Sequence, residues 1–251
     1  MSRAALAVRI GDFFFRYRNQ AFPIVVVALF ALAAPPTEIL GSEALERVTD
    51  LLALGLALLG LSLRGAVIGF AYIKRGGRLK RVYAKDLVTE GLFGVCRNPL
   101  YLGNLLICLA IFLMHGNVWV LTIGMGFFLA VYQCIVLAEE AYLTGEFGDA
   151  YRRYCAEAPR WLPRLTRLKE ATAGMTFKAR RAIDKDYATI ALTLAVLAAI
   201  EAYEVLAAPA LLAQANYVAV LVAVMILCGI STILIKLSKR RAAYARAKQV
   251  S

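Results

Sequence analysis

The sequence is poor in the residues that build metal sites and disulfides. It contains one histidine and five cysteines in 251 residues, and no two cysteines form a CxxC pair. We therefore predict neither a zinc site nor disulfides. No secretory signal peptide or low-complexity tract is evident. The sequence also lacks an internal repeat, which argues against a transporter, because many transporters are built from repeats.

Long apolar runs dominate the chain. It is 61% hydrophobic with a mean hydropathy of +0.67, whereas soluble domains are roughly 45–50% apolar. Six apolar stretches cover residues 20–34, 50–73, 99–115, 118–138, 187–208 and 216–236. All but the first and third are long enough for a bilayer core, which takes about 20 residues. We expect an all-α polytopic membrane helix bundle of about six transmembrane helices with a cytoplasmic helical cap.

The positive charge lies mainly in alternate loops and at the two ends of the chain. Lysine and arginine number 29 against 17 acidic residues, a net charge of +12. The loops after the first, third and fifth stretches contain only one basic residue, Arg47. Six spans with both termini in the cytoplasm would place every basic loop inside. This topology, with attraction to anionic headgroups, explains the charge, so we predict no nucleic-acid binding.

We divide the chain into four parts. Residues 1–19 contain four arginines and three consecutive phenylalanines, and we expect an interfacial amphipathic segment. Residues 20–168 form a membrane core of four spans plus the cap, 169–186 a basic linker, and 187–251 a two-span hairpin with a basic tail. In the cap, an apolar stripe predicts one helix along the membrane surface, which the prolines at 159 and 163 end. The stripe consists of Leu143, Phe147, Tyr151 and Tyr154.

One arginine interrupts the second apolar stretch. Arg64 would cost about 2.5–3.5 kcal/mol inside a membrane on insertion scales, so it should face a partner or a wet cavity. Two interpretations remain open. Arg64 clamps an anionic group of a substrate, or its role is structural, as a buried ion pair with Glu201 or Glu204 or by snorkelling to the interface.

The third stretch begins with a polar motif. Asn98 and Pro99 have the pattern of a helix start, with Asn98 as N-cap and Pro99 in the first turn, directly after Arg97. A helix N-terminus offers free N–H groups and partial positive charge, which suit a carboxylate or a phosphate.

An acidic pair, Glu139 and Glu140, closes the fourth stretch. Such a pair is often only a charged helix end, but here Arg97 and Tyr101 are expected at the same membrane depth. Adjacent helical residues point about 100° apart. One carboxylate should therefore face the bundle and the other solvent or the next helix.

Four motifs follow one another between about residues 50 and 165. They are GLSLR at 60–64, LVTEGLF at 87–93, RNPLYLG at 97–103, and a closing pattern of Glu139-Glu140, Leu143, Phe147-Gly148, Tyr151, Tyr154 and Pro159-Arg160. Their order and spacing resemble the integral-membrane methyltransferase family of isoprenylcysteine carboxyl methyltransferase and the phospholipid N-methyltransferases. The resemblance implies S-adenosylmethionine as methyl donor, held under a cytoplasmic lid, and a lipid or lipid-modified acceptor from the bilayer.

The resemblance also suggests roles for these residues. Arg97 would pair with a carboxylate of the donor, the acidic pair would hold its ammonium or ribose hydroxyls, and tyrosines would offer aromatic faces. The expected cofactor-binding residues are Arg97, Asn98, Pro99, Tyr101, Gly103, Glu140, Tyr151, Tyr154 and Arg160. The expected catalytic residues are Glu139, Glu140 and Asn98, with Arg64 binding the substrate and no metal ion. In-line methyl transfer depends mostly on orientation, which agrees with the lack of a catalytic triad.

The family motif usually has histidine where this chain has Asn98. Asparagine cannot act as a general base, and the only histidine, His115, is expected in a turn at the opposite face. A carboxylate acceptor needs no base, whereas a protonated amine must first lose a proton. The substitution favours an anionic acceptor, or moves a base role to Glu139, Glu140 or a tyrosine. Alternatively, Asn98 positions the cofactor as the histidine would.

We therefore predict methyl transfer from S-adenosylmethionine to a membrane-embedded acceptor. Two alternatives remain. One is a membrane reductase of the sterol-reductase type that uses a nicotinamide dinucleotide, and the other is a non-enzymatic transporter or scaffold.

Overall fold

The computed structural model of the protein describes residues 2–70, 86–207 and 215–248. These residues are helical apart from connecting loops and contain no strand, only an isolated bridge between Ile39 and Ser42. The all-α prediction is confirmed. The helices are α1 (Arg3–Leu32), α2 (Glu43–Phe70), α3 (Leu92–Val95), α4 (Pro99–Met114), α5 (Val118–Phe147), α6 (Asp149–Glu157), α7 (Leu168–Ala171), α8 (Ala179–Ala207) and α9 (Ala215–Lys248), with a short 3-10 helix at Leu165–Arg167.

Four of these helices are long and apolar enough to cross a membrane: α2, α5, α8 and the Ala215–Arg241 part of α9. Helix α4 is apolar but has 16 residues, which at 1.5 Å per residue gives about 24 Å against a hydrocarbon core of about 30 Å. Four candidate spans are thus confirmed, and the count of six stays a prediction. The ends of the predicted stretches 50–73 and 187–208 and the loop between α8 and α9 lie outside the described residues.

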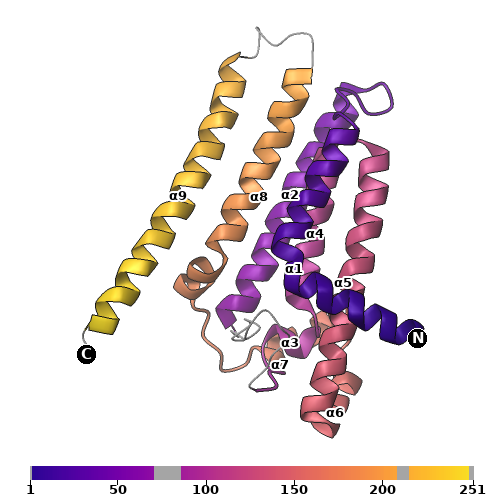
Figure 1. Ribbon diagram of the computed structural model, residues 1–251, viewed down its shortest axis with the longest axis vertical. Coiled ribbons are helices and arrows are strands. Elements are labelled where there is room, and N and C mark those ends of the chain that lie inside the picture. Colours follow the sequence, from indigo (N-terminus) through magenta and orange to yellow (C-terminus); the bar gives the residue numbers. More distant parts are fainter. Residues whose placement is uncertain (1, 71–85, 208–214, 249–251) are drawn as a thin grey trace.

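Small residues let the central helices approach closely. A Cβ atom added at Gly60 of α2 would lie 2.8 Å from the carbonyl oxygen of Gly103 in α4. A Cβ at Gly11 of α1 would lie 2.0 Å from the carbonyl oxygen of Cys134 in α5. Backbone approach at small residues is a common way to pack helices in membranes. Figure 1 shows the resulting bundle, with α8 between α2 and α9.

Helix α1 is continuous where two segments were expected. It runs from Arg3 to Leu32 and contains Pro23. Figure 1 shows the helix changing direction along its length. Proline clashes with the carbonyl group four residues earlier and bends a helix there. The predicted boundary between residues 19 and 20 therefore coincides with the place where Pro23 should bend α1, and the interfacial position of residues 1–19 stays a prediction.

The cap lies at one end of the bundle, around α3, α6 and α7 (Figure 1). Helix α5 passes through Glu139 and Glu140 and ends only at Phe147, so the acidic pair does not close that helix. Gly148, with φ of +51°, separates α5 from α6. The single surface helix predicted from the apolar stripe is therefore two helices. The stripe still gathers in one cluster, and α6 ends at Glu157 before the prolines, as expected.

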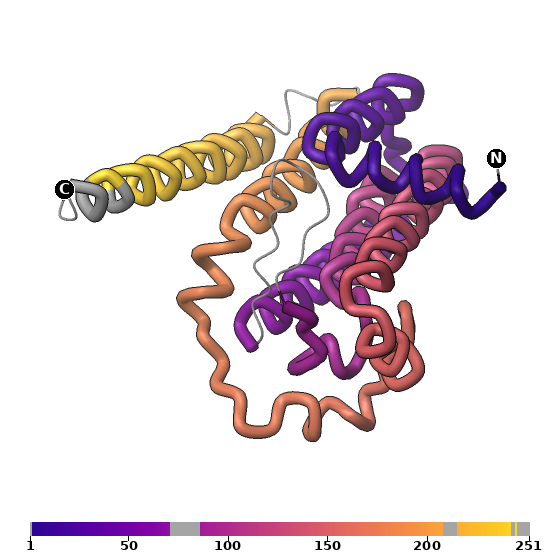
Figure 2. The backbone as a smooth tube through the Cα atoms, turned by 60° about the horizontal axis from the view of Figure 1, so that its bottom comes forward, coloured from indigo at the N-terminus to yellow at the C-terminus, as the bar shows by residue number. Residues whose placement is uncertain are grey.

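The C-terminal hairpin begins earlier than the sequence indicated. Helix α8 starts at Ala179, so the second half of the predicted linker 169–186 is helical and Asp186 lies within α8. Figure 2 shows α9 running away from the rest of the bundle beyond α8. Among the described elements, α9 packs mainly against α8, whereas α8 also packs against α2 and α4. The hairpin is thus joined to the core through α8.

Candidate active site

Glu140 lies at the centre of a cluster of charged groups under the cap. Its carboxylate accepts two hydrogen bonds from Arg160, from Nε at 2.9 Å and from Nη2 at 2.7 Å. Nη1 of Arg97 lies 3.1 Å from Oε1 of Glu140. The paired bonds from Arg160 are the strong bidentate kind. One carboxylate therefore joins α5 to the start of α4 and to the loop after α6.

Arg97 is held on several sides but not completely satisfied. Its backbone N–H donates to the carbonyl oxygen of Pro159 at 2.9 Å, and its Nη1 contacts Sγ of Cys155 at 2.7 Å. Burial acts to lower the pKa of the guanidinium, but interactions with Glu140, Cys155 and Tyr151 together outweigh it, so the pKa is raised. The Nε atom of Arg97 is buried and has no hydrogen-bond partner among the described residues. A polar donor thus remains available in the cluster.

Tyr151 and Tyr154 pack inside the cap. Both are buried, and their ring centroids are 6.0 Å apart. The Tyr154 hydroxyl donates to the carbonyl oxygen of Phe93 at 2.8 Å and so holds α3 against α6. Burial, with the negative charge of Glu140, raises the pKa of Tyr151, so its hydroxyl stays protonated at neutral pH. The predicted donor-binding role of the two tyrosines stays a prediction.

Glu139 and Glu140 have different partners, as the angle between neighbouring helical residues implied. The buried Tyr101 donates a hydrogen bond from its hydroxyl to Oε1 of Glu139 at 2.7 Å. Nη1 of Arg18, in α1, lies 3.5 Å from the same hydroxyl. Arg18 was not predicted from the sequence, because no local pattern distinguishes it from the other N-terminal arginines.

Asn98 begins α4 but does not cap it through its side chain. It occupies the N-cap position, as predicted, but its side chain makes no capping hydrogen bond. Instead, Nδ2 of Asn98 donates to the carbonyl oxygen of Arg160 at 3.1 Å, and the residue is 5% exposed. Neighbouring Cys96 lies 3.2 Å from the carbonyl oxygen of Trp161, and burial raises the pKa of its thiol. Pro99 is in the first turn, as predicted.

Arg64 forms a buried ion pair, but with a residue that was not predicted as its partner. Its partner is Asp186 of α8, to which Nε of Arg64 donates at 2.9 Å. The predicted partners Glu201 and Glu204 were wrong, and Glu201 instead accepts a 2.7 Å hydrogen bond from Tyr217. Sequence spacing offered no signal for Asp186, since it lies 122 residues from Arg64. Substrate binding by Arg64 stays a prediction.

Gly103 lies at the contact between α4 and α2 rather than among the charged groups. A Cβ atom there would lie 2.7 Å from Cγ of Arg64 and 3.0 Å from the carbonyl oxygen of Gly60. The structure therefore gives Gly103 a packing role, and its predicted contact with the donor remains untested.

A cavity of about 460 Å³ opens in the cap between the loop before α3 and the segment around α7. It is lined by part of the LVTEGLF motif and by charged residues of the cap: Thr89, Glu90, Gly94, Arg167, Glu170, Ala171, Ala173, Gly174 and Met175. Thr89 and Glu90 of the LVTEGLF motif thus line a cavity in the cap.

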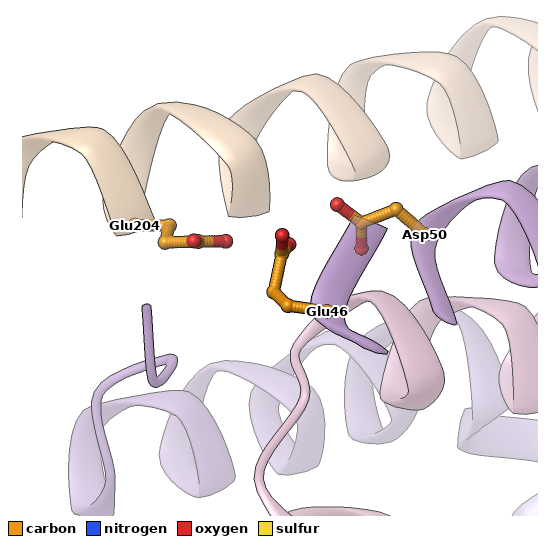
Figure 3. Close-up of side chains that lie close together, drawn as sticks. All are labelled: Glu46, Asp50 and Glu204. Atoms are coloured by element: carbon orange, nitrogen blue, oxygen red, sulfur yellow. The ribbon is translucent and has the colours of Figure 1, made fainter. Parts of the chain in front are cut away.

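The opposite end of the bundle holds other polar groups. Oxygen atoms of Glu46, Asp50 and Glu204 lie within 4.8 Å of one another (Figure 3). This spacing would suit a metal ion, although no metal site was predicted, and acidic clusters are common without an ion.

His115 lies in the turn after α4, as predicted. Its side chain is fully buried, and its ring lies 4.4 Å from that of Phe30.

Part of the chain is similar to known proteins. Residues 51–150 match the phospholipid methyltransferase family. The chain is 32% identical over 118 residues to protein-S-isoprenylcysteine O-methyltransferase of Schizosaccharomyces pombe. This match covers 44% of this chain and 48% of that enzyme. It is 29% identical over 167 residues to the cobalt-zinc-cadmium resistance protein CzcN of Cupriavidus metallidurans, covering 65% of this chain and 71% of CzcN. No solved structure matches.

An uncharacterized protein of Haemophilus influenzae is 45% identical over 65 residues, which are 25% of this chain and all of that protein. The chain spans about half the length of the S. pombe enzyme (48%). The family match at 51–150 includes Arg97, Tyr101, Glu139 and Glu140, whereas Arg160 and Asp186 lie beyond it. Over residues 51–150, these matches support a membrane methyltransferase family like that of the phospholipid and isoprenylcysteine methyltransferases.

Proposed function

We propose that this protein transfers a methyl group from S-adenosylmethionine to a lipid or lipid-modified acceptor at the cytoplasmic face of a membrane. The observation that carries the proposal is the cluster of Arg97, Glu140 and Arg160 in a chain of this family. The cluster brings together two cations and a carboxylate between the membrane helices and the cap.

The residues present suit the polar groups of the donor. The buried Nε of Arg97, which has no partner among the described residues, offers a hydrogen bond to a carboxylate. Glu139 and Glu140 offer acceptors for an ammonium group or for ribose hydroxyls. The donor would thus be held by Arg97, Arg160 and the acidic pair.

Bound S-adenosylmethionine supplies an electrophilic methyl group on a sulfonium sulfur. The protein's part is to hold donor and acceptor in line and to exclude water, since orientation alone can supply much of the rate. Asn98 holds the start of α4 to the cap through the carbonyl oxygen of Arg160. Glu139, which accepts a hydrogen bond from the Tyr101 hydroxyl, is a carboxylate that would take up a proton from an acceptor amine. An anionic acceptor would need no such transfer.

The proposed topology has six spans with both termini and the site in the cytoplasm. The four long apolar helices would supply four of these spans, and the shorter α4 and the bent α1 would supply the other two. The distribution of lysine and arginine supports this orientation. Family membership favours neither alternative considered above, the nicotinamide-dependent reductase or the transporter.

Isothermal calorimetry on the purified full-length protein tests the donor. S-adenosylmethionine and S-adenosylhomocysteine should bind to the wild type, and Arg97→Ala or Glu140→Ala should weaken binding at least about tenfold, which is 1.4 kcal/mol. Arg152→Ala and Asp149→Ala break an exposed ion pair of the same cap and serve as controls. A folded protein that binds neither compound would refute the proposal.

The acceptor is tested with a donor that carries a labelled methyl group. Membranes containing the protein would be supplied with phosphatidylethanolamine vesicles or with a farnesylated N-acetylcysteine. Label in phosphatidylethanolamine would identify N-methylation of a lipid. Label in the farnesylated cysteine would identify O-methylation of a carboxylate.

A further inference from the structure

The buried pair of Arg64 and Asp186 belongs to a polar network that joins three helices. Asp186 is 3% exposed and accepts hydrogen bonds from both Nε and Nη2 of Arg64. Nη2 also donates to Thr189 of α8 at 3.2 Å, and Nη1 donates to Asn104 of α4. Every nitrogen of the guanidinium therefore has an acceptor within the protein. In this arrangement Arg64 is fully engaged in holding α2, α4 and α8 together.

The network meets α4 about one turn after Tyr101 of the candidate active site. The side chain of Arg64 crosses Gly103, where an added Cβ would lie 2.7 Å from Cγ of Arg64. The next residue, Asn104, takes the hydrogen bond from Arg64. Residues three apart share a helix face, so Asn104 and Tyr101 lie on the same side of α4. The position of Arg64 thus bears directly on the turn that presents Tyr101.

Aromatic contacts continue from Asn104 to Glu139. The side chain of Asn104 interacts with the hydroxyl of Tyr132 in α5. The ring of Tyr132 lies 5.3 Å from that of Tyr101, whose hydroxyl donates to Glu139. A continuous set of contacts therefore leads from the C-terminal hairpin to a candidate catalytic carboxylate.

We propose that Asp186 is a positioning residue which, through Arg64 and Asn104, holds the first turns of α4 in their working position. The inference rests on the proposed function. Without a counter-charge, Arg64 would move toward water, because an unpaired arginine in a membrane is costly and its long side chain can reach the interface. That movement would release Asn104. The hairpin, which lies outside the family match at 51–150, thereby completes the methyltransferase site.

Donor affinity and stability, measured together on the full-length protein, test this role. Asp186→Asn should weaken S-adenosylmethionine binding about tenfold, since small displacements of positioned groups are costly. Asp186→Glu retains the charge and should bind the donor within about threefold of wild type. The matched control is Glu201→Gln, which neutralises an acid of the same helix at the other end of the bundle.

A neutral pair separates positioning from simple stabilisation. Replacing a buried ion pair with apolar residues often preserves stability, so Arg64→Met/Asp186→Leu should regain the unfolding midpoint of wild type. The positioning role predicts that this variant binds the donor as weakly as Asp186→Asn does. Wild-type donor affinity in the neutral pair, or in Asp186→Asn, would overturn the proposal.

Failure of the proposed function would be recognised separately, as a wild-type protein that binds no donor. In that case a double-mutant cycle of Asp186→Asn with Tyr101→Phe, read from unfolding midpoints, still tests the network. Non-additive shifts support coupling between the two residues, and additive shifts overturn it.

Discussion

The hydroxyl of Tyr101 donates a 2.7 Å hydrogen bond to Oε1 of Glu139. Tyr101 lies in the first turn of α4, and Glu139 lies in the part of α5 that continues into the cap. The bond therefore ties α4 to the helix that carries Glu140, the partner of Arg97 and Arg160. Loss of this bond should change the reaction more than the fold.

We expect Tyr101→Phe to lower the rate of methyl transfer about tenfold or more. A hydrogen bond to a charged group contributes about 1.5–3 kcal/mol, and the phenylalanine ring retains the packing against Tyr132. The measurement is the initial rate of transfer of labelled methyl to whichever acceptor class the wild type modifies. Tyr217→Phe is the control, because it removes a hydrogen bond of the same length, to Glu201, at the other end of the bundle. Equal rates in the two variants would contradict the role of Tyr101.

Glu140→Gln should destabilise the protein by about 3 kcal/mol. The Glu140 side chain is 15% exposed and faces two arginines, and removing one partner of a buried ion pair leaves the remaining charge uncompensated. Thermal unfolding of the purified protein measures the effect. In contrast, Asp149→Asn removes a carboxylate from a pair that is more than two thirds exposed, and such pairs contribute about 0–1 kcal/mol. A midpoint for Glu140→Gln as high as that of Asp149→Asn would show that the cluster contributes little to stability.

Gly103→Ala should separate α2 from α4 and cost about 1–3 kcal/mol of stability, the usual range for overpacking. The new methyl group would lie 2.7 Å from Cγ of Arg64 and 3.0 Å from the backbone oxygen of Gly60, which has no side chain to move aside. Gly126→Ala in α5 is the matched control, because nothing lies within 4 Å of the added Cβ. Its midpoint should equal or exceed that of wild type, since alanine favours helix over glycine. Equal midpoints for the two variants would contradict the close contact.

Stability should fall as the pH rises above the ordinary pKa of cysteine. Burial raises the pKa of the Cys96 thiol above its ordinary value of 9.0, so above that pH the folded protein retains a proton that the unfolded chain releases. This contribution is complete below pH 9.0 and is lost as the pH rises toward the folded-state pKa, by at most about 1.4 kcal/mol per pH unit. Denaturant unfolding of wild type and Cys96→Ala at several alkaline pH values measures it. The variant should show the shallower decline, and identical declines would exclude Cys96 as a source.

The candidate site could be predicted in part, because its residues belong to short motifs. Arg97, Tyr101, Glu139, Glu140 and Arg160 are recognisable from local sequence, and the structure brings them together under the cap. The side-chain role of Asn98 was not predictable, because its partner is a backbone carbonyl 62 residues away. Nothing local marks Arg18 or Asp186 either, since each acts through a residue on a distant helix.

The sequence by itself determined the helical class, the apolar segments and the uneven distribution of basic residues, because helix formation and membrane insertion depend on residues close together in the chain. Only the tertiary structure decided which charges pair. Asp186, rather than Glu201 or Glu204, lies against Arg64, since packing brings the start of α8 next to the part of α2 that contains Arg64. The break at Gly148 likewise appears only in three dimensions, where its positive φ separates α5 from α6 and lets the cap fold back over Glu140.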